Sequence, residues 1–237
     1  MTTHRIVNHD DWLAARRALL EEEKAFSRAR DALAKRRREL PWEEVTKDYT
    51  FQTPAGPRTL AELFAGRNQL FVYHFMLGPG WAEGCKSCSY LADHFDGMLP
   101  HLGQRDVSFT AVSRAPLAEI ERFKQRMGWR FPWVSAADTD FNFDFDASSR
   151  PTDLEAGTAT YNYAPRDGSM TELPAASVFY RDTDGRVFHT YSTYARGLDT
   201  LIGTYNVLDL MPKGRDEDAL GFTMAWVRHH DNYERVE

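Results

Sequence analysis

The chain contains two cysteines, Cys85 and Cys88, which are separated by Lys86 and Ser87. A thiol attacks only as its thiolate, and a free cysteine ionises near pH ~8.5. At the start of a helix, unpaired backbone N–H groups and the positive end of the helix dipole stabilise a thiolate, and CxxC motifs have pKa values of roughly 3.5–7.5 there. The two-residue spacer lets the second sulfur reach the first and close a disulfide. The spacing predicts thiol–disulfide exchange, with Cys85 attacking and Cys88 resolving.

Two other roles for the cysteine pair stay open. CxxC is also half of a zinc site, but the chain has no second CxxC, and the spacing to His94 and His101 matches no familiar zinc finger. Two packed and inert thiols are the other alternative, since free cysteines are often buried. The position of the motif between a strand and a helix favours redox chemistry, which requires no bound cofactor.

The elements on either side of the motif predict how it is positioned. Residues 69–77 form a nearly continuous apolar run, which predicts a central strand covered on both faces. Residues 89–102 carry apolar side chains at helical spacing, so the cysteines fall at a strand-to-helix junction. Another strand is predicted over 106–113 and another helix over 116–127. Strands that alternate with helices indicate a sheet with parallel members and helices on its faces.

The first part of the chain predicts a long helix over residues 10–40, capped by Asp10 or Asp11. We expect residues 1–45 to form a helical extension of the main domain. A narrow apolar stripe repeats every seven residues, and it could lie against the domain or against a second copy, giving a homodimer. The stripe consists of Trp12, Leu19, Phe26, Leu33 and Leu40. After it, a short strand over 49–53 and a helical turn capped by Thr59 are predicted.

Residues 137–173 break the alternation of strands and helices. They are rich in Asp, Thr, Ser and Gly, which predicts an insertion with one short strand near 161–163. Within it, aspartates alternate with phenylalanines over 138–146, a pattern that favours an extended edge with one aromatic face.

The last part of the chain predicts a hairpin followed by helices. The hairpin joins 176–181 to 186–191 across a turn that ends in Gly185. Helices are predicted over 197–209 and 221–233.

Four histidines are further candidates for chemistry. His74 lies on the strand before the cysteines and could act on a thiol proton, but a hydrogen-bonded core histidine is the preferred interpretation. His189 and the pair His229-His230 suggest metal binding. Adjacent histidines on a helix point about 100° apart, so capping or packing is preferred for that pair.

The composition excludes several classes of function. The chain has 237 residues and a net charge of −6, which argues against general nucleic-acid binding. It has no stretch near the roughly 18 apolar residues that a membrane span requires, and residues 1–10 lack the apolar run of a secretory signal. We therefore expect a cytoplasmic protein that binds neither nucleic acid nor membrane, with a protein or small-molecule disulfide or thiol as its substrate.

From Tyr49 onward the chain resembles the peroxiredoxin and TlpA-like branch of the thioredoxin superfamily. More closely, it is similar to a bacterial thioredoxin-like family known as domain-of-unknown-function family 899. The matching segments are Glu83–Ser89, Ser177–Asp182, Val187–Gly197 and Trp226–Asp231. The resemblance implies an α/β fold in residues 46–237: a thioredoxin-like mixed sheet flanked by helices, with the long helix before it and the insertion ahead of the closing hairpin.

Two departures from the superfamily patterns bear on function. The peroxiredoxin pattern Pro-x-x-x-Thr/Ser-x-x-Cys is absent, because Gly78 and Ala82 occupy its first and fifth positions, so peroxide reduction of that kind is not expected. Thioredoxins place a cis-proline directly before the strand that faces the cysteines, whereas here Pro174 lies a few residues ahead of the strand expected at Ser177. A non-catalytic thioredoxin-like binding or dimerisation module is therefore the alternative to an oxidoreductase.

Overall fold

Strand β4 (Gln69–His74) lies at the centre of a six-stranded mixed sheet. The computed structural model describes residues 4–234. In the sheet, β4 pairs in parallel with β5 on one side and antiparallel with β9 on the other. The strand order is β1-β10-β9-β4-β5-β6. The remaining strands are β1 (Glu43–Glu44), β5 (Val107–Ser113), β6 (Trp133–Ser135), β9 (Ala175–Arg181) and β10 (Val187–Tyr194).

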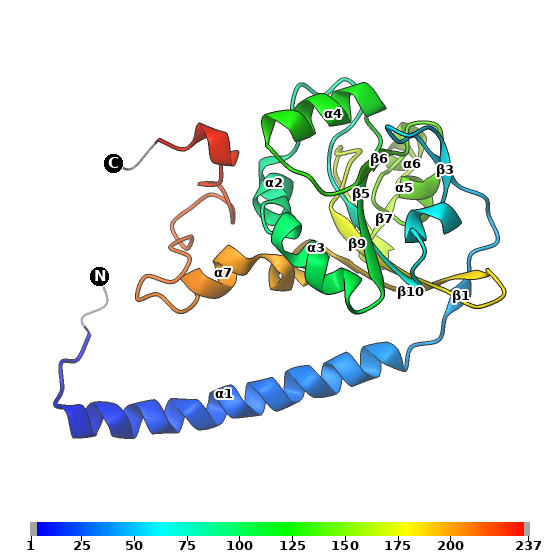
Figure 1. The fold of residues 1–237 in the computed structure, drawn as a ribbon. Coiled ribbons are helices and arrows are strands. Elements are labelled where there is room, and N and C mark those ends of the chain that lie inside the picture. Colours follow the sequence, from blue (N-terminus) through cyan, green and yellow to red (C-terminus); the bar gives the residue numbers. More distant parts are fainter. Residues whose placement is uncertain (1–3, 235–237) are drawn as a thin grey trace. The chain divides into compact units, whose positions relative to one another are not determined.

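Both faces of β4 are buried, as the apolar run predicts. Tyr73 and Phe75 belong to a large aromatic core on one face, whereas Leu70 and Val72 belong to a second core on the other. Figure 1 shows the helices of the first face on one side of the sheet and α5 on the other. The first face is covered by α2 (Lys86–Ala92), α3 (Phe95–Gly103), α4 (Leu117–Arg126) and α7 (Gly203–Leu208). This arrangement is thioredoxin-like, and it confirms the expected fold.

The second face is covered by short elements. The strands β2 (Thr50–Phe51) and β3 (Arg58–Thr59) form a small hairpin, followed by the 3-10 helix η1 (Ala61–Phe64). Thr59 ends β3, one residue before the N-cap position at Leu60, and its hydroxyl accepts a hydrogen bond from the backbone N–H of Glu62 in the helical turn. The Glu62 carboxylate accepts from the backbone N–H of Thr59 in return.

The expected helix over 89–102 is two helices, and it begins earlier. Helix α2 starts at Lys86, so Cys88 lies within it, and the chain turns at Asp93 and His94 before α3. Both turn residues are held by distant partners: Asp93 accepts from the indole of Trp129, and His94 accepts from the backbone N–H of Thr204. These tertiary contacts override the helical periodicity of the segment.

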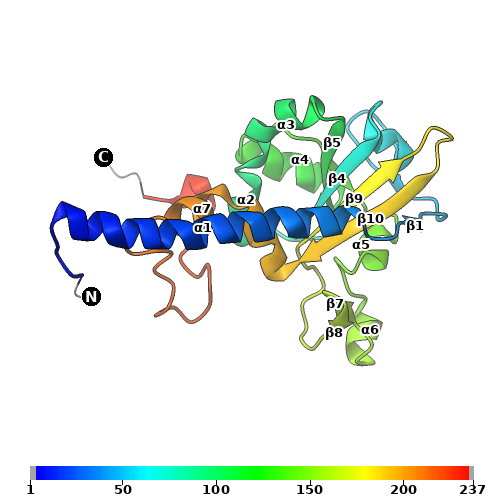
Figure 2. The same ribbon diagram turned by 90° about the horizontal axis from the view of Figure 1, so that it is seen from below.

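The insertion contains more structure than its composition indicates. The aspartate–phenylalanine segment, expected as an extended edge, forms the short helix α5 (Phe141–Asp144), which buries Phe141 against the second face. Helix α6 (Pro151–Glu155) follows, and the expected short strand is half of a hairpin, β7 (Thr160–Tyr161) with β8 (Ala164–Pro165). Figure 2 shows α6 and this hairpin projecting from the sheet.

The C-terminal part is mostly irregular. After β10 come η2 (Ala195–Leu201), α7 and, near the end, η3 (His230–Asn232). The helix predicted over 221–233 is wrong, because hydrogen bonds to one carboxylate replace a helical ladder there. Glu217 accepts from the hydroxyl of Tyr205, the backbone N–H of Met224 and the indole of Trp226, at 2.6–3.0 Å.

The chain divides into two compact units, Met1–Pro41 and Trp42–Glu237. The first unit contains α1 (His9–Arg38), which confirms the expected long helix. Its cap is Asn8, whose side chain accepts from the N–H of Asp11, so the expected capping by Asp10 or Asp11 is wrong. No helix among residues 4–234 is long and apolar enough to cross a membrane.

Candidate active site

Cys85 is the N-cap residue of α2, and a ten-residue connection that contains a turn separates it from the end of β4. Its backbone N–H donates to the carbonyl of Met76 at 3.0 Å, which ties the turn to the end of the strand. Its carbonyl accepts from both the N–H and the hydroxyl of Ser89, each at 2.9 Å. The position that the sequence predicts for Cys85, at the amino end of a helix, is confirmed.

The residue before Cys85 must be glycine. A Cβ on Gly84 would stand 2.5 Å from the ring of Phe75 and 2.7 Å from the ring of Phe123, well inside van der Waals contact. The carbonyl of Gly84 accepts a 2.9 Å hydrogen bond from Nε2 of His229, which is fully buried. The turn is therefore held by the core on one side and by the C-terminal segment on the other.

The two thiols differ in their affinity for a proton. A hydrogen bond from the Cys88 side chain lowers the pKa of Cys85 to about 6, although burial opposes it, and the backbone N–H groups of Ser87 and Cys88 add to the effect. Burial and the neighbouring Cys85 sulfur raise the pKa of Cys88 well above its usual range. Near neutral pH, Cys85 is therefore mainly a thiolate and Cys88 a thiol that donates to it.

Tyr73 completes this arrangement from the adjacent strand. It is 1% exposed, and its side chain forms a hydrogen bond with the sulfur of Cys88, which lowers the pKa of that thiol in opposition to burial. The order Tyr73, Cys88, Cys85 is thus a short chain of polar atoms that runs from the core to the partly exposed sulfur. The role of Tyr73 could not be found from the sequence, because Tyr73 resembles any aromatic residue of a buried strand.

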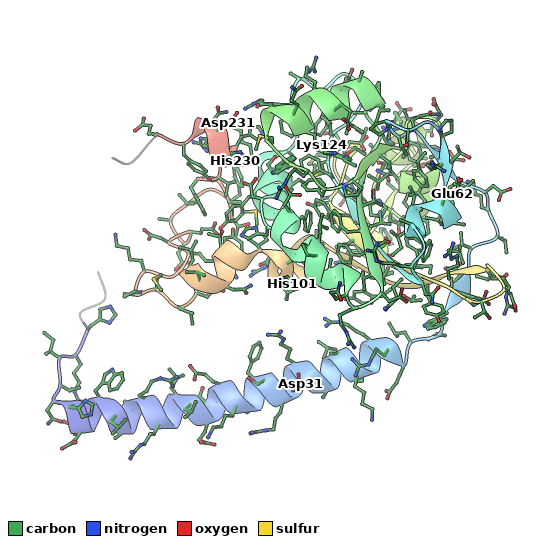
Figure 3. All side chains as sticks on the ribbon, viewed as in Figure 1. Asp31, Glu62, His101, Lys124, His230 and Asp231 are labelled. Carbon is green, nitrogen blue, oxygen red and sulfur yellow. The ribbon has the colours of Figure 1, made fainter. Side chains whose placement is uncertain are left out.

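A pocket of about 350 Å³ opens over the cysteines. Cys85, Cys88 and Tyr73 line it, and most of its other lining residues are apolar. They come from the chain after β4, α2, the insertion, the loop before β9, η2 with the residue after it, and the C-terminal segment. They include Met76, Leu91, Met170, Pro174, Leu198, Ile202 and Met224. A second pocket, of about 410 Å³, is lined in part by Glu62 and Lys124 (Figure 3), but neither a cysteine nor a histidine lines it.

Pro174 stands directly before β9, because that strand begins at Ala175, two residues earlier than expected. It lines the pocket, but none of the peptide bonds in residues 4–234 is cis. Its carbonyl accepts a 2.7 Å hydrogen bond from the hydroxyl of Tyr161, which in turn accepts from the N–H of Ala195 at 2.9 Å. Tyr161 thereby joins the insertion, the loop before β9 and the start of η2. Its role could not be found from sequence, since it depends on three distant segments.

The other candidate histidines do not contact the thiols. His74 is buried on the opposite face, where Nδ1 and Nε2 lie 3.0 Å from Oδ1 of Asn142 and Oγ of Ser177, which confirms a hydrogen-bonded core histidine. His189 forms a hydrogen bond with the hydroxyl of Ser192. His230 (Figure 3) forms one with the carboxylate of Asp93, directly after α2. Among the described residues, no group of three or more potential metal ligands comes together.

The model of a family described as "Bacterial protein of unknown function (DUF899)" matches residues 1–233. No curated protein matches the chain.

Similar solved structures include peroxiredoxins from three organisms. A PrxQ variant from Xylella fastidiosa is 14% identical, with a TM-score of 0.45, covering 70% of this chain and 94% of that chain. Peroxidoxin BcpB from Mycobacterium tuberculosis is 16% identical, with a TM-score of 0.42 and coverage of 71% and 97%. A peroxiredoxin Q variant from Xanthomonas campestris is 15% identical, with a TM-score of 0.46 and coverage of 71% and 98%.

Proposed function

The chain belongs to the DUF899 family of bacterial proteins, and for this member we propose thiol–disulfide exchange at Cys85 and Cys88. The observation that carries the proposal is the placement of the two thiols: Cys85 is partly exposed at the amino end of α2, Cys88 is buried within that helix, and both line one pocket. An accessible sulfur with a lowered pKa is a nucleophile, and a neighbouring protonated sulfur can later attack the mixed disulfide and resolve it.

The reaction proceeds in two exchanges. The Cys85 thiolate attacks one sulfur of a substrate disulfide, forms a mixed disulfide and releases the other half of the substrate as a thiolate, which takes a proton. With the charge on Cys85 gone, the pKa of Cys88 falls, because the neighbouring negative charge was one of the causes that raised it. Cys88 then loses its proton and attacks Cys85, which releases the second thiolate.

The net result is a two-electron transfer. The substrate disulfide is reduced to two thiols, and the protein is oxidised to a Cys85–Cys88 disulfide, which a cellular dithiol reduces again. Tyr73 donates to the Cys88 sulfur and so stabilises the thiolate that forms in the second exchange. The same steps run in reverse when the protein oxidises a dithiol. A measured reduction potential near about −270 mV would indicate a reductant, and one near about −120 mV an oxidant.

The test is alkylation with iodoacetamide as a function of pH, analysed by peptide mass. We expect Cys85 to react with an apparent pKa near 6 and Cys88 to remain unmodified, and we expect mild oxidation to join the two residues in a reducible disulfide. A Cys85 pKa like that of free cysteine, with no such disulfide, would reject the proposal in favour of the non-catalytic binding module.

A further inference from the structure

Three segments outside the sheet line the pocket together with Cys85. Met170 comes from the insertion, Leu198 from η2, and Met224 from the C-terminal segment. The last of these is fixed by Glu217, which accepts from the backbone N–H of Met224 and the indole of Trp226. The volume of about 350 Å³ lies at the low end of the ~300–1,000 Å³ that small-molecule pockets occupy.

The backbone beside the pocket offers little to an extended peptide. Peptides often dock by pairing with free N–H and C=O groups at a strand edge. Here the N–H of Leu173 donates to Ala147 at 2.9 Å, Pro174 has no N–H, and the carbonyl of Pro174 accepts from Tyr161. The insertion therefore occupies the groups that a protein substrate would use.

One cationic side chain that lines the pocket, Arg196, is largely exposed. Arg196 lines the pocket with its side chain 81% exposed, and within residues 4–234 it forms one ion pair, with Asp199 at 3.4 Å. Asp199 is also held by Arg215 at 3.1 Å, and Arg215 is itself shared with Asp209. Because a guanidinium carries five N–H donors, most of those on Arg196 face solvent at the mouth.

We infer that the pocket takes a low-molecular-weight disulfide with an apolar body and an anionic end, and that protein disulfides are not its substrates. The inference rests on the proposed function. The apolar lining receives the hydrocarbon chain, Cys85 attacks the sulfur, and Arg196 binds the carboxylate.

The experiment compares the reaction of the reduced protein with 4,4′-dithiodibutyrate, its neutral diamide and insulin. Each rate constant is divided by that of dithiothreitol under the same conditions, which removes the intrinsic reactivity of the disulfide. We expect the normalised rate constant to be at least about tenfold higher for dithiodibutyrate than for insulin, and about fivefold higher for the acid than for the diamide, as one screened charge pair predicts.

Variants separate the two parts of the inference. Arg196→Gln should bring the acid-to-diamide ratio close to one, whereas Arg130→Gln, which removes an 85% exposed arginine elsewhere, should leave it unchanged. Met170→Gln should slow both small disulfides by the same factor. If insulin reacts as fast as dithiodibutyrate after normalisation, the substrate class is wrong and thiol–disulfide exchange stands. If the protein reduces none of the three disulfides faster than dithiothreitol does, the proposed function fails as well.

A second inference comes independently from α1. Trp12, Leu19, Phe26 and Leu33 are 45–70% exposed along one stripe of the helix, and Leu40 continues it. Charge is distributed unevenly along the same helix. Residues 9–23 contain five acidic and two basic side chains, whereas residues 24–38 contain one acidic and seven basic ones.

We propose that α1 pairs antiparallel with α1 of a second copy. An antiparallel pair places the acidic half of each helix beside the basic half of the other, whereas a parallel pair would place like charges together. With Phe26 at the centre, the stripe brings Leu19 of one copy opposite Leu33 of the other.

Sedimentation of the full chain tests the pairing. We expect a dimer that Phe26→Glu converts to a monomer, while Ala14→Glu, on the opposite side of the helix from the stripe, has no such effect. In a chain with Cys85 and Cys88 replaced by serine, L19C mixed with L33C should form the mixed cross-link, and L19C alone should not cross-link to itself. A monomeric chain, or cross-linking of L19C to itself, overturns the proposal.

Discussion

The proton on Cys88 sets the reactivity of Cys85. Replacing Cys88 with alanine removes the hydrogen bond that is the largest cause of the lowered pKa of Cys85, while the desolvation that raises it persists. We expect C88A to raise the apparent pKa of Cys85 by one to two units, towards the ~8.5 of a free thiol. Alkylation across pH 5–9 measures this.

The serine variant is the matched control for this prediction. Its hydroxyl can still donate to the Cys85 sulfur, so C88S should keep most of the lowered pKa although it cannot resolve a mixed disulfide. Equal pKa values for Cys85 in C88A, C88S and the parent protein would show that the hydrogen bond has no such role.

His74 gives a prediction on the dependence of stability on pH. Burial lowers its pKa to about 4, against an ordinary value of 6.5, so the unfolded chain binds a proton that the folded chain excludes. The stability that the neutral ring supplies is complete above pH ~6.5 and is lost as the pH falls towards 4, by about 3 kcal/mol in all. Urea unfolding at pH 5 and pH 7 measures how steeply the free energy of unfolding depends on pH.

His74→Gln should flatten this slope, even though the variant also loses a stacked contact with Phe141. His101→Gln, at an exposed position on α3 (Figure 3), should retain it. A slope between pH 5 and pH 7 that is the same in both variants would contradict the assignment.

At this scale the sequence predicts the residues whose chemistry is local. Cys85 and Cys88 are found because both the residue type and the spacing carry the signal. Tyr73 and Tyr161 are missed because their roles arise from contacts between distant segments. The packing role preferred for His229 is confirmed, but its partner, a carbonyl 145 residues away, could not be found from the sequence.

Among the elements, the turn before α2 leaves no room for a side chain. Gly84→Ala would force its new methyl group into the rings of Phe75 and Phe123, so we expect a loss of about 1–3 kcal/mol and slower alkylation of Cys85 as the turn shifts. Thermal unfolding and alkylation rates measure the two effects.

Gly97 on α3 supplies the control for this substitution. A Cβ there would meet no atom within 4 Å, and alanine stabilises a helix interior by roughly 0.5–1 kcal/mol relative to glycine. Gly97→Ala should therefore stabilise the protein without altering Cys85. Equal effects of the two alanines would refute the packing argument for Gly84.

Elements with a strong local pattern are predicted well from the sequence, and those fixed by tertiary contacts are not. The apolar run of β4, the seven-residue repeat of α1 and the glycine turn of the β9–β10 hairpin each predict the observed element. The turn between α2 and α3 and the irregular segment after α7 escape prediction, since hydrogen bonds to His94 and Glu217 override a helical pattern there.

For the whole molecule, the border between the two units lies at Pro41, ahead of the expected border at residue 45. Trp42 packs on Tyr180 with ring centroids 4.9 Å apart, and β1 pairs with β10, so residues 42–45 belong structurally to the sheet. We expect a chain that starts at Trp42 to be about 2 kcal/mol more stable than one that starts at Thr46. Denaturant midpoints of the two chains check this, and equal midpoints would favour the later border.

The pocket that contains the cysteines is lined by two sets of residues, which come from different parts of the fold. The two cysteines, Tyr73 and Gly84 belong to β4, α2 and the turn between them, whereas much of the remaining pocket lining belongs to the insertion, η2 and the C-terminal segment. Under the proposed function, substitutions in those three segments would alter which disulfide is accepted and leave the two thiols unchanged. The fold thus allows specificity to diverge among relatives that share one reactive centre.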